Sequence, residues 1–208
     1  TLPKAKVFRL ADGSTRMAPN GIKDPSGLAA QPAESWPGAP LVPTGNPMLD
    51  GVGPAAYAQR PDETEKTLHG DHRIVPMRVA TDFQVESRDP DPRGMLVVGR
   101  DGKVGGVVVD IWVDRAESMI RYLEVSLEND AAEAESTTAR NVLLPICFTR
   151  IDGWLRQVKV KSILSNHFAD VPVTQNPDMV TQLEEDRITA YYGGGTLYAV
   201  PESQEPLL

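Results

Sequence analysis

The chain has 208 residues and a formal net charge of −8 at pH 7, so its size allows one large domain or two small ones. This acidic balance argues against a nucleic-acid-binding protein, and against attachment to anionic lipid through the bulk charge of the chain. The single cysteine, Cys147, excludes an internal disulfide and a cysteine-rich metal cage, and we expect it to be buried as a small apolar residue.

Residues 1–60 are rich in turn formers and hold half of the 18 prolines. Phe8–Leu10 is a short apolar stretch that closes at the turn Asp12–Gly13, and from Pro19 to Pro54 no periodicity lasts long enough to predict an element. Apolar residues are interleaved with these turn formers, whereas a disordered linker is usually poor in them. We therefore predict an extended segment that becomes ordered on a surface, with a flexible tail as the alternative.

Residues 61–72 are polar and are predicted to form an exposed loop that contains His69, Asp71 and His72. Histidine titrates near pH ~6.5, so a histidine pair beside a carboxylate could collect and pass protons. The same three side chains could hold a divalent metal loosely. The remaining alternative is that they are ordinary solvated loop residues.

A series of short apolar runs separated by turns and loops follows this loop. Pro145 favours an edge or strand-end position for its run, because proline cannot donate to a sheet ladder. This pattern predicts a small antiparallel barrel or sandwich. Its strands are separated in places by the turns Asp101–Gly102 and Asp152–Gly153 and by a polar loop at Ala131–Arg140. The predicted strands are Arg78–Val85, Met95–Val98, Val104–Val113, a half-buried Ile120–Leu127, Val142–Ile146 and Gln157–Ile163.

Carboxylates gather at the end of the Val-rich strand: Asp110, Asp114, Glu117 and Glu124, with Arg121 among them. Buried carboxylates have raised pKa values and can carry protons near neutrality. The alternative is a solvated hairpin end with a weak surface ion pair, either Asp114–Arg115 or Glu117–Arg121.

The last segment changes to a helical pattern. Asn176–Pro177–Asp178 predicts a helix start, and Gly193–Gly195 predicts its end, followed by a tail with a short strand. None of the common nucleotide-binding, zinc-protease or serine-hydrolase motifs is present, so the sequence does not predict an enzyme.

Seven segments, taken in order, together resemble the H subunit of the purple-bacterial photosynthetic reaction centre. The resemblance covers nearly the whole chain, and the region from Asp91 to Pro172 is similar to a PRC-barrel, a small β-barrel. The segments are LPKAKVFRL, PTGNPMLDGVGPAAYA, RIVPMRVATDF, DPRGMLVVGRDGKVGGVVVDIWVDRAESMIRYLEV, VLLPICFTRID, VKVKSILSNHFADVP and LEEDRITAYYGGGTLYA.

The resemblance implies a mainly β fold in three parts. Residues 1–77 would be an extended, irregular segment docking on partner subunits, residues 78–172 a small antiparallel PRC-type barrel, and residues 173–208 a C-terminal α-helix and tail. The implied function is a non-pigment-binding, non-enzymatic subunit that caps the cytoplasmic face of the L and M subunits and helps conduct protons to the secondary quinone. The alternative is a soluble PRC-barrel adaptor that binds another protein, as in ribosome maturation.

The resemblance also implies partners and a location. The chain itself would hold no cofactor or metal and bind no nucleic acid. Bacteriochlorophyll, bacteriopheophytin, quinones and iron would lie in L and M, with the core light-harvesting antenna nearby. Members of the family have an N-terminal transmembrane helix, so we expect this chain to be the portion on the cytoplasmic face of the bacterial inner (intracytoplasmic, chromatophore) membrane, with its anchor missing.

The implied proton route runs from a histidine-rich loop to an acid in a D-x-x-E segment. Glu117 matches that acid, His69 matches one histidine position, and Asp71 stands where a second histidine can occur, with His72 displaced by one residue. Arg121 is the expected charge partner of Glu117. The implied docking residues on the partner subunits are Pro43, Gly45, Pro47, Met48, Asp50, Gly53 and Pro54.

Overall fold

The structure is a computed structural model that describes residues 4–20, 27–127 and 140–204. Most of the loop predicted at Ala131–Arg140 and the end of the predicted tail lie outside these residues. No helix within the described ranges is long and apolar enough to cross a membrane.

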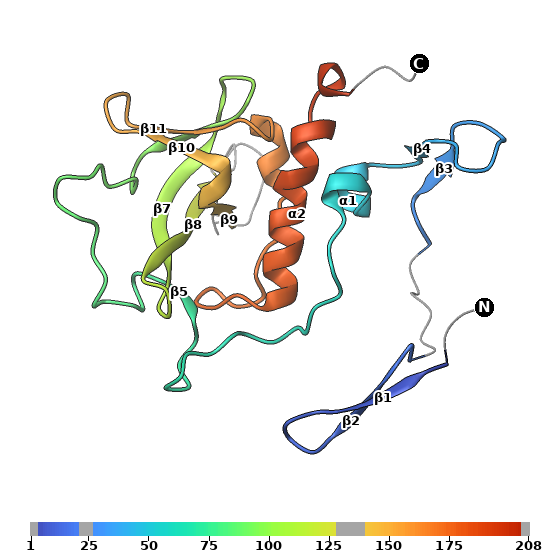
Figure 1. Cartoon of the computed structure of the whole chain (residues 1–208). Coiled ribbons are helices and arrows are strands. Elements are labelled where there is room, and N and C mark those ends of the chain that lie inside the picture. The colour runs from blue at the N-terminus through green and yellow to red at the C-terminus, as the bar shows by residue number, and fades with distance from the viewer. Residues whose placement is uncertain (1–3, 21–26, 128–139, 205–208) are drawn as a thin grey trace, which may run out of the picture.

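A seven-stranded sheet forms the centre of the molecule (Figure 1). Its hydrogen-bonded order is β10-β11-β6-β7-β8-β9, and β5 pairs with β7 beside β6. The predicted mainly β fold is confirmed, although β11 runs parallel to β6 while the other pairs are antiparallel. The strands are β5 (Ile74–Pro76), β6 (Leu96–Val98), β7 (Val104–Asp114), β8 (Met119–Leu127), β9 (Arg140–Pro145), β10 (Thr149–Asp152) and β11 (Gln157–Val160).

The long hairpin of β7 and β8 is buried on both faces, unlike the half-buried strand predicted for Ile120–Leu127. Leu123 and Val125 have no exposed surface, and Tyr122 and Glu124 on the opposite face are only 3% and 5% exposed. The second face is buried because the C-terminal helix contacts Tyr122. Residues 177–178 cover the region of Glu124, since Arg78 binds both Glu124 and the Pro177 carbonyl. Burial on both faces explains why carboxylates of this hairpin are enclosed.

Two predictions near these strands are wrong. The strand predicted at Arg78–Val85 is a series of turns, and the strand β5 lies just before it. Cys147 is exposed, because it lies in a short 3₁₀ turn (η2, Ile146–Phe148) whose neighbours Ile146 and Phe148 take the inward positions. Pro145 is the last residue of the edge strand β9, as predicted.

The C-terminal helix α2 (Gln182–Tyr198) begins later than predicted and continues through the glycine triplet. Thr181 is its N-cap: the threonine hydroxyl accepts from the Glu184 amide, and the Glu184 carboxylate accepts from the Thr181 amide. The glycines lie inside the helix, and because they have no side chains, neighbouring segments of the chain can approach the helix backbone closely. A Cβ on Gly194 would lie 2.6 Å from the Ala55 side chain, and one on Gly195 would lie 2.5 Å from the Ser162 carbonyl oxygen. The short strand predicted after the triplet is therefore the end of this helix.

The N-terminal region contains short elements, of which the sequence pattern indicated only the strand-like stretch before the turn Asp12–Gly13. Two isolated ladders pair β1 (Lys6–Arg9) with β2 (Thr15–Ala18) and β3 (Ala30–Pro32) with β4 (Leu41–Pro43). The helix α1 (Pro47–Asp50) and the turn η1 (Gly53–Ala55) then pack on α2, which separates them from the sheet (Figure 1).

The segment predicted to dock on partners is thus partly used within the chain. Met48, Val52 and Ala55 are buried against the chain itself, so Met48 is not an outward-facing docking residue. Of the other predicted docking residues, Gly45, Asp50, Gly53 and Pro54 are exposed, while Pro43 and Pro47 are intermediate.

Replacing Gly195 with alanine is expected to lower the free energy of unfolding by about 2 kcal/mol, because the new methyl group meets backbone that must move. Gly193→Ala is the matched control in the same helix. Its Cβ would meet only the Pro54 carbonyl oxygen, at 3.1 Å, and alanine favours a helix over glycine by about 1 kcal/mol, so the change should be small. Urea unfolding measures both variants; equal effects would show that close approach does not explain Gly195.

Candidate functional site

Arg73 joins three carboxylates at one end of the sheet. Its Nε lies 3.0 and 3.1 Å from the two Asp114 oxygens, and its Nη2 lies 2.8 Å from Asp114 Oδ2. The same guanidinium reaches Glu65 Oε2 at 2.8 Å through Nη1 and Glu117 Oε1 at 2.7 Å through Nη2. Each of the three guanidinium nitrogens therefore contacts a carboxylate.

The strand register brings these groups together. Ile74 of β5 is paired with Asp114 of β7, so Arg73 lies just beyond the last residue of β7, beside the turn that carries Glu117. Backbone hydrogen bonds from the Arg73 amide to the Glu65 carbonyl and from the Arg115 amide to the Arg73 carbonyl hold the loop, the strand and the turn in place.

Asp114 is held ionised although its side chain is only 1% exposed. Burial pushes the pKa of Asp114 upward, but the hydrogen bond from Arg73 and those from the Glu117 and Ala116 amides outweigh it and hold the pKa below its usual value. In turn, the Asp114 hydrogen bond raises the pKa of Arg73. The expectation that buried acids of this strand have raised pKa values is therefore wrong for Asp114.

Glu117 is the open end of the cluster, since 56% of its side chain is exposed. Its charge partner is Arg73. The sequence had predicted Arg121 instead. Arg121 instead lies 3.5 Å from Glu185 of α2, which also accepts a 2.8 Å hydrogen bond from the Tyr122 hydroxyl.

Glu185 is the protonatable acid of the site. Burial raises its pKa, and this effect outweighs the hydrogen bond from Tyr122 and the positive charge of Arg121, which lower it. Burial and the neighbouring Glu185 also raise the pKa of Tyr122, so the phenol stays a hydrogen-bond donor. The site thus contains a carboxylate that stays charged, Asp114, and one whose proton is held more tightly, Glu185.

A cavity of about 670 Å³ is bordered by both clusters. Glu65 and Arg73 of the Arg73 cluster line it, as do Arg121, Tyr122 and Glu185. A polar space of this size has room for water with several partners, so proton transfer across it does not require direct contact between the acids.

The predicted histidine loop is a tight turn that leads directly into Arg73. The Thr67 amide donates to the Asp71 carbonyl, and His72 Nδ1 lies 2.9 Å from the Thr64 hydroxyl. His69 and Asp71 line a second cavity, of about 540 Å³, together with Asp82 and Ala116. His72 does not line this cavity. The structure therefore brings His69 and Asp71 together, whereas His72 contacts Thr64.

Metal binding by the loop, which the sequence left open, finds no support in the geometry. Within the ranges that the structure describes, no three His, Cys, Asp or Glu side chains converge as possible metal ligands.

Asp110 and Glu124, the other acids of the hairpin, belong to a separate cluster. Arg78 Nη1 lies 3.1 Å from Asp110 and 2.5 Å from Glu124, and its Nε lies 3.0 Å from Asp178. Glu124 also accepts hydrogen bonds from the Trp112 indole and the Asn141 amide. This cluster links the segment before α2 to the sheet, so we assign it a structural role.

Sequence reasoning missed Arg73, Glu65 and Glu185. Arg73 directly follows the histidine loop, and the short apolar run IVP after it is the only sign of a strand. Glu185 is a polar residue on a helix whose inward face becomes evident only when α2 is placed beside Tyr122.

Asp114→Asn is expected to lower the free energy of unfolding by about 3 kcal/mol at pH 7, because it leaves Arg73 without its buried partner. The lowered pKa of Asp114 means that its contribution is present above the ordinary aspartate pKa and is lost as the pH falls through the lowered value. The difference between wild type and variant in urea unfolding should therefore shrink in acid.

Asp91→Asn is the matched control for this measurement. Asp91 pairs with Arg93 at the surface, where both side chains are about 40% exposed, so its loss should cost less than about 1 kcal/mol. A cost for Asp114→Asn as small as that of the control would contradict a structural role for the buried pair.

Two family models match the chain, one after the other. The photosynthetic reaction centre H-chain N-terminal region matches residues 1–79, which include the docking segment, the histidine loop and Arg73. The PRC-barrel domain matches residues 84–165, which include strands β6 to β11. Within the described residues the hydrogen-bonded path of these strands does not close into a complete ring. With both matches in this order, the chain belongs to the family of H subunits of photosynthetic reaction centres.

Proposed function

We propose that this chain caps the cytoplasmic face of the L and M subunits of a reaction centre and conducts protons toward the secondary quinone. Membership of the H-chain family already implies a membrane-associated complex with other subunits. The observation that carries the finer proposal is the row of titratable groups from the surface loop, through the Arg73 cluster, to Glu185 across one polar cavity.

The surface end of this route is the pair His69 and Asp71. Ala116 lines the same cavity as this pair, and its amide donates to Asp114, so the loop cavity borders the Arg73 cluster. Glu117, which pairs with Arg73 and is about half exposed, is a second group that can take a proton from solvent. Carriers spaced within one water of each other avoid the large cost of moving a lone charge through a protein interior.

The inner end of the route is Glu185. Its raised pKa suits an acid that holds a proton and releases it when negative charge develops nearby, as when a quinone is reduced. Asp114 cannot share this task, because Arg73 stabilises its charged form. Its proposed role is to keep Arg73 fixed between Glu65 and Glu117.

The docking segment also lines this cavity. Its residues Pro54, Ala56, Tyr57 and Ala58 are part of the lining, and Pro54 is exposed. A partner subunit that covered the exposed part of this segment would close the cavity, and protons would then have to pass into the partner. This continuity supports capping and proton conduction as one arrangement.

In this proposal the chain is an accessory subunit and not itself an enzyme. The pigments, quinones and iron belong to L and M. The alternative of a ribosome-maturation adaptor has only the barrel region in its favour, whereas the match over residues 1–79 is to the reaction-centre H chain.

Reaction centres assembled with Glu185→Gln are expected to reduce the secondary quinone fully at least tenfold more slowly, because general acid–base groups contribute on the order of 10²-fold or more. Glutamine keeps an oxygen for the Tyr122 hydroxyl but cannot carry the proton. Glu117→Gln should show a smaller slowing, since solvent can substitute for an exposed group. The measurement is proton uptake and electron transfer after a second flash, as a function of pH.

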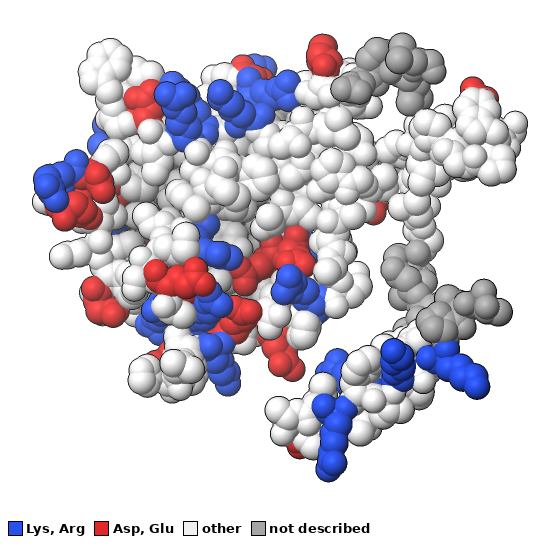
Figure 2. Space-filling view, in the orientation of Figure 1, with Lys and Arg blue, Asp and Glu red and all other residues white. Residues whose placement is uncertain are grey.

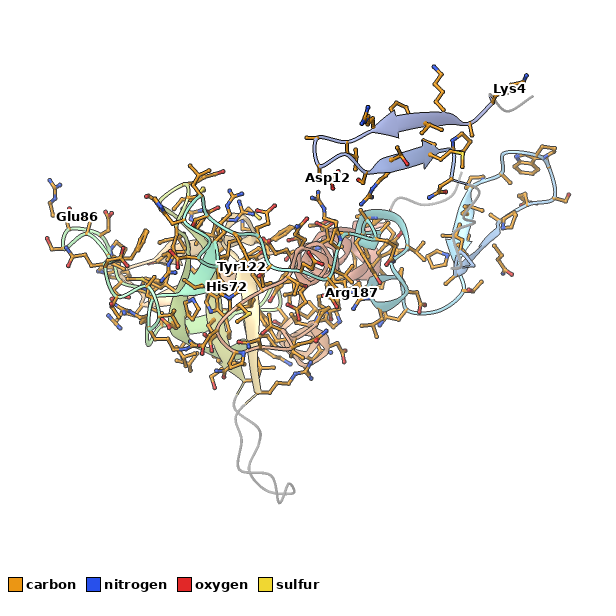
Figure 3. The ribbon with its side chains drawn as sticks, turned by 90° about the horizontal axis from the view of Figure 1, so that it is seen from below. Lys4, Asp12, His72, Glu86, Tyr122 and Arg187 are labelled. Carbon is orange, nitrogen blue, oxygen red and sulfur yellow. The ribbon has the colours of Figure 1, made fainter. Side chains whose placement is uncertain are left out.

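Glu86→Gln is the control, because Glu86 lies on an exposed loop remote from His72 and Tyr122 (Figure 3). It makes the same chemical change outside the route and should leave the rate unchanged. Rates of Glu185→Gln that equal those of Glu86→Gln at every pH would remove Glu185 from the route.

A further inference from the structure

The hairpin of β1 and β2 is the least covered element of the described chain. Every residue from 4 to 20 is exposed, and both strands pair only with each other. The hairpin stands apart from the sheet and from α2 (Figure 1), and the backbone bonds of its turn, from Leu10 to Ser14 and from Gly13 to Leu10, are internal. A lone two-stranded hairpin is at best marginally stable in water, so its regular pairing points to something that covers it.

Basic side chains dominate the charge of this hairpin. Residues 4–18 carry Lys4, Lys6, Arg9 and Arg16 but a single acid, Asp12, whereas the whole chain has a net charge of −8. Asp12 lies in the turn, where hydrogen bonds from the Ser14 hydroxyl and amide hold its pKa below the usual value. None of the four basic side chains forms an ion pair within the part of the chain that the structure describes.

Bulky apolar side chains lie among these charges on both faces of the hairpin. Val7 is paired with Met17, and the two are 67% and 53% exposed; Phe8, on the other face, is 51% exposed and is paired with Arg16. The centre of a protein–protein interface is depleted in lysine but enriched in arginine, methionine and aromatic residues, so only the lysines of the hairpin argue against such an interface. Basic residues beside exposed Phe, Val and Met are instead typical of segments that bind at an anionic membrane surface.

We propose that this hairpin binds the anionic phospholipid headgroups of a bilayer through one face, with Lys6 and Arg16 on phosphates and Phe8, which shares their face, at the boundary with the acyl chains. The acidity of the rest of the chain does not oppose this, because charges are screened over about 8 Å at physiological ionic strength and the hairpin forms a separate lobe (Figure 2). The contact is additional to docking on partner subunits and does not depend on proton conduction.

The test is co-sedimentation of the whole 208-residue chain with vesicles of phosphatidylcholine, with and without phosphatidylglycerol. We expect binding to the phosphatidylglycerol vesicles alone, weakened by high salt. Each basic residue at such a surface contributes about a fivefold change in partitioning, so the double variant Lys6→Gln and Arg16→Gln, on the face of Phe8, should bind roughly 25-fold more weakly. Thermal unfolding of the sheet should be unchanged, since the hairpin is exposed on all sides.

The matched control is Lys103→Gln with Lys161→Gln, which removes the same charge from exposed positions just before β7 and just after β11. It should bind vesicles as the wild type does. Absence of binding to phosphatidylglycerol vesicles, or equal losses in both double variants, would overturn the proposal. A hairpin variant that kept its vesicle binding but assembled poorly with the other reaction-centre subunits would also overturn it, and would assign the hairpin to a protein interface.

Discussion

The ion pair of Arg73 and Asp114 is the contact on which the site depends. It forms where β5 meets the end of β7, and it fixes the polar loop, the β7–β8 turn and the sheet relative to one another. Removing a charge from water is costly, and a single carboxylate repays little of that cost. Here two backbone amides complete the shell of Asp114, and the solvent side of Arg73 is left for Glu65 and Glu117.

Two carboxylates of the site acquire different chemistry from their surroundings. Asp114 is buried beside a guanidinium and stays charged, whereas Glu185 is buried beside a phenol and a more distant arginine and keeps its proton more readily. In the proposed route, a proton crosses the polar cavity that Glu65, Arg73 and Glu185 line, while the charged framework stays fixed. Opposite pKa shifts in neighbouring acids are a common basis for proton transfer.

The sequence allowed most strands of the sheet, but not β5 and β10, and the presence of a C-terminal helix to be predicted, because alternation and turn residues are local signals. It could not predict that α2 would run through Gly193–Gly195, since those glycines serve neighbours distant in sequence, Ala55 and Ser162. For the site, the pattern identified Glu117 and the histidine loop, but the partner of Glu117 depends on strand register. Register placed Arg73 at the end of β7, and the contact of α2 with β8 placed Glu185 beside Arg121.

The central claim is that the site holds one buried acid with a lowered pKa, Asp114, and one partly buried acid with a raised pKa, Glu185. Following the side-chain carboxyl carbons of the isotope-labelled whole chain by NMR as the pH is changed tests it most directly. The account predicts that Asp114 titrates below the usual aspartate value and Glu185 above the usual glutamate value. A Glu185 that titrates at or below its usual value would contradict the account.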